Sequence, residues 1–173
     1  DFLERERDAM SPVLGIDPRG SPSIVLDLSV DSPLISGDPA ENAEPMLTQR
    51  IGATMRAANV KLAIGRYDEP RLLYEAPAFA NGAGPFEEHR TIHLGLDLFA
   101  EVGTPVFAPL DGVVHAFTDQ REPLDYGPVI MLRHETDNGL EFFTLYGHLS
   151  RKSLDGLTVG MLVRAGDKIA TLG

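Results

Sequence analysis

Short runs in which apolar and polar residues alternate fill the second half of the chain, and Gly, Pro or Asp separate them. The runs are His93–Leu98, Pro105–Ala108, Gly112–Phe117, Val129–His134, Glu141–Leu149 and Leu162–Leu172. Alternation with a period of two predicts β-strands. The segments between the runs are too short for crossover helices, so we expect mainly antiparallel pairing, in a sheet, barrel or sandwich.

The first 85 residues show a mixed pattern instead. Their expected elements are a short charged helix or tail, a strand, a second helix and a hairpin: residues 1–10, 24–28, 45–58, and 60–64 with 71–74. The second helix is indicated by apolar residues that recur near one helical face. The sequence therefore predicts a mainly β protein, with an α+β flank or linker over residues 1–85 and an antiparallel β domain over residues 86–173.

Composition narrows the set of partners. The formal net charge of −11 argues against a nucleic acid or an anionic membrane surface, because both require a positive surface. No apolar run approaches the ~20 residues that span a bilayer. The lack of cysteine excludes disulfides and thiolate metal sites. Without a signal peptide either, a cytoplasmic location is slightly favoured. Because the chain begins at Asp1, we expect it to be processed or to belong to a longer polypeptide with flanking domains.

The first candidate site is the run His93–Asp97, in which His93, Gly95 and Asp97 share the polar face of a predicted strand. The leucines of this run are expected to face the core. A straight strand separates residues four apart by ~13 Å, whereas metal–ligand bonds are ~2.0–2.2 Å. A shared metal therefore requires a bend or bulge at Gly95, where a missing Cβ makes bending easy. Taken alone, such a His-x-x-x-Asp pair also occurs by chance.

The second candidate site lies at the end of the run Glu141–Leu149. Thr144, Tyr146 and His148 share one face of this predicted strand, and His148 comes at its end, where a side chain can reach a groove. A neutral His148 there could accept a proton or stabilise an oxyanion, and Tyr146 could add a hydrogen bond. The alternative is a histidine that caps a loop and a tyrosine in the core. His134 is assigned a structural role.

Six short motifs, which follow one another along the chain, include these candidate residues. They are His93-Leu-Gly-Leu-Asp97, Gly103-Thr-Pro105-Val106-Phe-Ala108, Asp111-Gly112-Val-Val114, Tyr126-Gly127-Pro-Val129, Tyr146-Gly-His148-Leu-Ser and Val159-Gly160…Ala165-Gly166-Asp-Lys-Ile169. Together they resemble the lysostaphin/LytM-type zinc metallopeptidases over about residues 86–173. The resemblance implies a small, mostly antiparallel β domain with a groove over a four-stranded sheet.

The resemblance also implies a chemistry. Zinc polarises a peptide carbonyl and activates water, usually on short glycine-rich or D-alanyl peptides of peptidoglycan. By motif match, His93 and Asp97 would be zinc ligands and His148 a catalytic or oxyanion-stabilising residue, with Tyr146 beside it. The family closes its site with a later His-x-His motif that supplies the third ligand. This chain ends at Gly173, before that motif, so we expect it to bind zinc weakly and hydrolyse poorly.

Two explanations of the missing motif remain open. Continuation of the polypeptide past Gly173 is favoured over a truncated, inactive relative. A looser resemblance is to the central module of phosphotransferase–peptidase–aminotransferase fusion proteins, in which the domain would serve as a binding or spacer module without turnover. A third alternative is a biotinyl or lipoyl carrier with Lys168 at a hairpin. It ranks last, because it leaves His93, Asp97 and His148 unexplained.

Overall fold

The fold is known from a computed structural model, which describes residues 1–42, 44–71, 80–81, 88–89, 91–121 and 125–173. The helices are α1 (Phe2–Glu6), η1 (Pro39–Asn42), α2 (Met46–Ala57) and η4 (Arg151–Leu154), of which η1 and η4 are 3₁₀ helices. The first strands are β1 (Ser23–Leu26), β2 (Leu62–Gly65), β3 (Glu69–Pro70), β4 (Ala80–Asn81), β5 (Glu88–His89), β6 (Ile92–His93) and β7 (Asp97–Phe99). They are followed by β8 (Pro105–Phe107), β9 (Gly112–Asp119), β10 (Pro128–Glu135), β11 (Glu141–Tyr146), β12 (Leu162–Val163) and β13 (Lys168–Thr171).

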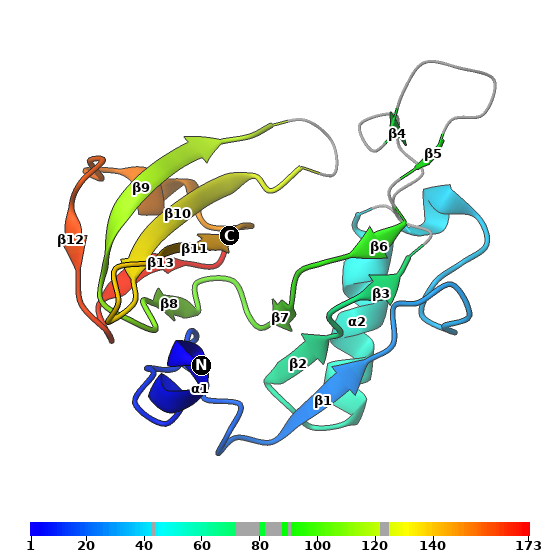
Figure 1. Cartoon of the computed structure of the whole chain (residues 1–173). Coiled ribbons are helices and arrows are strands. Elements are labelled where there is room, and N and C mark those ends of the chain that lie inside the picture. Colours follow the sequence, from blue (N-terminus) through cyan, green and yellow to red (C-terminus); the bar gives the residue numbers. More distant parts are fainter. Residues whose placement is uncertain (43, 72–79, 82–87, 90, 122–124) are drawn as a thin grey trace. The chain divides into compact units, whose positions relative to one another are not determined.

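The chain divides into two compact units, named here for their places in the sequence (Figure 1). The middle unit is Ser21–Ala100, and the terminal unit is Asp1–Gly20 together with Glu101–Gly173. The domain boundary expected at residue 85 lies outside the described residues. Each unit is therefore described by itself.

The middle unit is built on a three-stranded sheet of order β1-β2-β7. β1 and β2 run parallel, and α2 lies between them in the sequence, as the crossover of a parallel pair requires. β7 pairs with the other edge of β2 in antiparallel register. The predicted hairpin is therefore wrong for residues 62–64, because both edges of β2 are taken by β1 and β7. Its second arm lies mostly outside the described residues.

One apolar cluster joins the helix to this sheet. Its buried members are Leu26, Leu28, Ile35, Ile51 and Ala63. Figure 1 shows α2 lying along β1 and β2, and Ile51 is the buried residue of that helix. The helix predicted over residues 45–58 is thus confirmed, and burial of its apolar face holds it against the sheet.

The terminal unit is built on a four-stranded antiparallel sheet of order β11-β10-β9-β12 and the antiparallel pair β13-β8. The buried apolar residues that lie on these strands come from every one of them except β11: Val106, Val114, Val129, Ile130, Leu132, Val163 and Ala170. The residues of β11 alternate between exposed and half-buried, as a period-two pattern predicts. The mainly β class and the antiparallel pairing of the second half are confirmed.

The start of the chain belongs to this second unit. The Phe107 amide donates to the Val13 carbonyl at 2.8 Å, and the Gly15 amide donates to the Pro105 carbonyl at 3.0 Å. Between these two bonds lies an antiparallel bridge of Leu14 with Val106, and Leu14 is buried. Residues 1–20 are therefore not a free tail. Among the described residues, no helix is long and apolar enough to cross a membrane.

Candidate functional site

The backbone bends at Gly95, as a shared site of His93 and Asp97 requires. β6 ends at His93 and β7 begins at Asp97, with a bend at Gly95 between them. The bend brings His93 Nε2 to 3.5 Å from Asp97 Oδ1. A Cβ on Gly95 would lie only 3.0 Å from His93 Nε2, so the glycine also makes room for the imidazole ring.

The expectation that the leucines of this run face the core is wrong for two of them. Leu94 is 55% exposed and Leu96 is 60% exposed. Both lie in the interruption between β6 and β7, where the strand alternation on which the expectation rested no longer holds.

Two different strand pairs position the two candidate ligands. His93 lies opposite Glu69 in the β3/β6 pair, and Asp97 lies opposite Gly65 in the β2/β7 pair. The approach at Gly65 is very close, because a Cβ there would lie 2.9 Å from both Cβ and Oδ2 of Asp97. His93 and Asp97 keep only 15% and 27% of their side chains exposed.

A buried arginine holds Asp97. Nη1 of Arg71 lies 2.7 Å from Asp97 Oδ2, and its Nε donates to Glu69 Oε2 at 2.8 Å. The side chains of Arg71 and Glu69 are only 6% and 2% exposed. Burial alone would lower the pKa of Arg71, but the charges of Asp97 and Glu69 together raise it above its ordinary value. Arg71 thus stays charged between two carboxylates.

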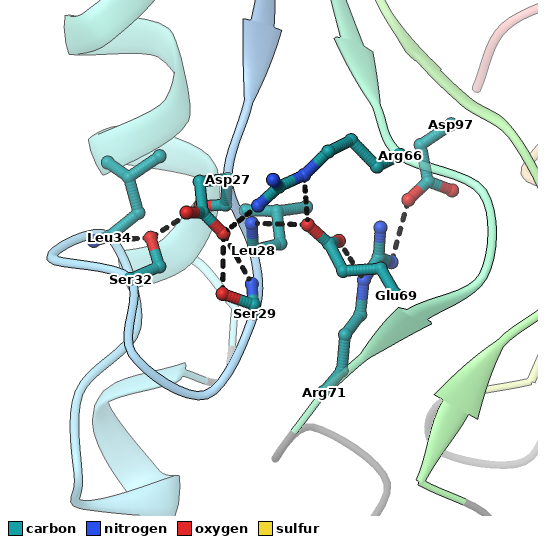
Figure 2. Close-up of polar contacts among 9 residues, drawn as sticks. All are labelled: Asp27, Leu28, Ser29, Ser32, Leu34, Arg66, Glu69, Arg71 and Asp97. Atoms are coloured by element: carbon teal, nitrogen blue, oxygen red, sulfur yellow. Dashed lines mark hydrogen bonds and ion pairs between the residues drawn. The ribbon is translucent and has the colours of Figure 1, made fainter.

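Glu69 is fixed from its other side as well (Figure 2). Its Oε1 accepts hydrogen bonds from the Leu28 amide at 3.1 Å and from Arg66 Nε at 2.9 Å. Burial would raise the pKa of Glu69, but the hydrogen bonds from Arg71, Leu28 and Arg66 lower it below its ordinary value. Arg66 in turn pairs with Asp27 near the surface. Sequence reasoning missed Glu69 and Arg71. The available signal was their spacing of two around Pro70, which places both on one face of an extended segment.

Tyr146 belongs to a partly buried chain of hydrogen bonds in the terminal unit. Its hydroxyl donates to Thr144 Oγ1 at 2.8 Å, and Thr144 Oγ1 lies 2.8 Å from His134 Nε2. His134 Nδ1 lies 2.8 Å from the Asp111 carbonyl oxygen, which only accepts, so Nδ1 carries a proton. In the neutral ring, Nε2 then accepts from Thr144. Burial raises the pKa of Tyr146 to about 12, so its phenol is protonated at neutral pH.

His148 follows two residues after β11 and is exposed. Its backbone has a φ of 53°, which is uncommon for a residue other than glycine. Two backbone hydrogen bonds hold this conformation: the His148 amide donates to the Tyr126 carbonyl at 2.7 Å, and the Gly173 amide donates to the His148 carbonyl at 3.0 Å. A fixed backbone with an exposed imidazole suits a side chain that acts on a ligand.

The four candidate residues thus fall into two pairs. His93 and Asp97 lie in the middle unit, where the structure brings their donor atoms together, whereas Tyr146 and His148 lie in the terminal unit. Within the described parts of the chain, no group of three His, Cys, Asp or Glu side chains could hold a metal ion. The donor pair is nevertheless of the right kind, because imidazole nitrogen and carboxylate oxygen are both zinc ligands.

Comparison with known proteins agrees with this reading of the second half. Residues 91–173 match Peptidase family M23. An "Uncharacterized metalloprotease" of Haemophilus influenzae is 42% identical over 81 residues, which are 47% of this chain and 15% of that protein. The "DD-carboxypeptidase/endopeptidase Mpg" of Neisseria meningitidis serogroup B is 46% identical over 59 residues, which are 34% of this chain and 12% of that protein. No solved structure matches the chain.

These matches establish the class of the domain. The chain carries a LytM-type peptidase domain of family M23 over residues 91–173. The chain spans less than a sixth of the length of the relatives named above. The matched region covers all four candidate residues.

Proposed function

We propose that this domain is a zinc metalloendopeptidase domain that acts on peptidoglycan-type peptides, with His93 and Asp97 as zinc ligands. The observation that carries the proposal is the 3.5 Å separation of His93 Nε2 and Asp97 Oδ1 across the bend. Two ligands of one tetrahedral zinc ion, each ~2.0–2.1 Å from the metal, lie about 3.4 Å apart. The substrate class is supported by the family resemblance and by the relative named as a DD-carboxypeptidase/endopeptidase.

Each candidate residue has a distinct proposed role. A zinc ion held by His93 and Asp97 would supply a Lewis acid for the peptide carbonyl. His148 would hold or move a proton at its exposed ring, or donate a hydrogen bond to the carbonyl oxygen. Tyr146 would not act as a base, since its phenol keeps its proton at neutral pH, and to donate a hydrogen bond to the substrate it would give up the bond that it donates to Thr144.

The proposal includes a third zinc ligand that the described residues do not supply. Catalytic zinc sites typically use three protein ligands. A site of His93 and Asp97 alone should therefore bind zinc more weakly than a complete one. The competing proposal is a binding or spacer module in a larger, aminotransferase-containing protein, which would use the same fold without turnover.

Zinc binding tests the ligand assignment directly. Zn²⁺ is titrated into the chain by calorimetry, and into the variants His93→Ala and Asp97→Asn. Both variants should lose most of the zinc affinity while their circular dichroism stays unchanged. The matched control is His115→Ala, which removes an exposed histidine from β9. Zinc binding that does not depend on His93 and Asp97 would contradict the assignment.

Peptide cleavage then separates the two proposals. D-alanyl and glycine-rich peptides are incubated with the zinc-loaded protein, in a longer form of the polypeptide that also contains the third ligand, and the products are quantified. We expect His148→Ala to keep the zinc affinity and to lose turnover. Zinc binding through His93 and Asp97 without any cleavage would favour the binding or spacer module.

A further inference from the structure

We propose that Arg71 is a positioning residue, which fixes the Asp97 carboxylate so that Oδ1 faces His93 Nε2, and that Glu69 holds Arg71 in place for this purpose. The inference rests on the proposed function, in which His93 and Asp97 bind zinc. It assigns a task to the segment before the peptidase-family match, since Glu69 and Arg71 both precede residue 91.

The geometry divides the two oxygens of Asp97 between two partners. Oδ2 lies 2.7 Å from Arg71 Nη1, and Oδ1 lies 3.5 Å from His93 Nε2. A carboxylate with one oxygen held by a guanidinium offers a metal its other oxygen. Partners of this kind fix the orientation of a metal ligand and tune its affinity for the metal.

The second contact of Arg71 explains why the guanidinium stays where it is. Its Nε is bound by Glu69, whose other oxygen is held by the Leu28 amide and by Arg66. Figure 2 shows the resulting row of side chains, from Asp27 through Arg66, Glu69 and Arg71 to Asp97. The charges alternate in sign along this row, so each buried charge has an opposite neighbour, as burial requires.

Gly65 supplies the space for this arrangement. A Cβ at Gly65 would lie 2.9 Å from Asp97 Oδ2 and 3.1 Å from Arg71 Nη2. Any side chain there would push against both partners of the ion pair. The close approach of β2 to β7 at this position thus leaves room for the ion pair of Arg71 and Asp97.

The test compares the zinc affinity of the chain with that of Arg71→Gln, by calorimetric titration of Zn²⁺. We expect Arg71→Gln to bind zinc roughly 10- to 100-fold more weakly. The matched control is Arg19→Gln, which removes a guanidinium that pairs with Asp17 in the terminal unit. Its zinc affinity should stay near that of the unchanged chain. The visible spectrum of bound Co²⁺ should change for Arg71→Gln and not for Arg19→Gln, since it reports ligand geometry rather than stability.

The outcomes distinguish this inference from the proposed function. If the unchanged chain binds no zinc, or binds it without His93, the proposed function fails. If zinc binding depends on His93 but is the same in Arg71→Gln, the positioning role is refuted and the proposed function stands. Should Arg71→Gln not fold, a structure of the zinc-loaded chain decides. An Asp97 that binds zinc through both oxygens and releases Arg71 overturns the inference, whereas a retained contact supports it.

Discussion

The half-buried phenol of Tyr146 makes the stability of the terminal unit depend on pH in the alkaline range. Its pKa rises from an ordinary 10.0 to about 12 in the folded chain, because of burial. As the pH rises, the unfolded chain therefore loses this proton first. The stability contributed by the neutral phenol is complete below pH 10 and is lost as the pH rises to about 12. A tenfold difference in proton affinity is worth about 1.4 kcal/mol, so the full loss is about 3 kcal/mol, roughly half of it by pH 11.

Urea unfolding at several pH values measures this loss, in the unchanged chain and in Tyr146→Phe. The variant keeps the ring and removes the ionisable group, so its unfolding free energy should fall less steeply above pH 10. Tyr126→Phe is the matched control, because it removes a phenol that is 43% exposed from the same unit. Its pH dependence should follow that of the unchanged chain. Equal losses of stability in the unchanged chain and in Tyr146→Phe would refute the reasoning.

Two further predictions concern packing. Ile51→Ala should lower the free energy of unfolding of the middle unit by about 2–5 kcal/mol, because Ile51 is the buried residue of α2; a loss well below 1 kcal/mol in urea unfolding would contradict this. Gly112→Ala should destabilise the terminal unit by about 1–3 kcal/mol, since its Cβ would lie 2.5 Å from the Arg133 carbonyl oxygen. Gly20→Ala, with no described atom within 4 Å of its Cβ, is the control, and similar unfolding curves for the two variants would exclude the clash.

The alternation of apolar and polar residues was sufficient to predict the elements that depend only on residues close in sequence. The alternation along β9, β10 and β11 predicts strands, and the few residues between them in the sequence predict antiparallel pairing of neighbours, as observed. The bend at Gly95 followed from one glycine and from the reach of two side chains. These are properties of short segments, and they need no knowledge of distant residues.

Apart from the exposed Leu94 and Leu96, the missed features depend on distant residues. The sequence does not reveal that β2 pairs with β1 across the α2 crossover, so a hairpin was the simpler expectation. That sheet brings Gly65 opposite Asp97, and β3 brings Glu69 opposite His93. The position of Arg71 beside Asp97 therefore depends on pairings between strands that lie far apart in sequence. No period or motif near His93 signals them.

The bridge between Leu14 and Val106 has a consequence for how the chain folds. The two residues are about 90 positions apart, and the whole middle unit lies between them. During synthesis, residues 11–15 can pair with residues 105–109 only after the latter have emerged from the ribosome. The middle unit is continuous in sequence, so all of its residues have been synthesised by then. Each doubling of loop length adds only about 0.6 kcal/mol to the entropic cost of closing the loop. A longer or shorter middle unit would therefore change the stability of this bridge little. Its effect would fall on the rate of folding, which slows as contacts become less local.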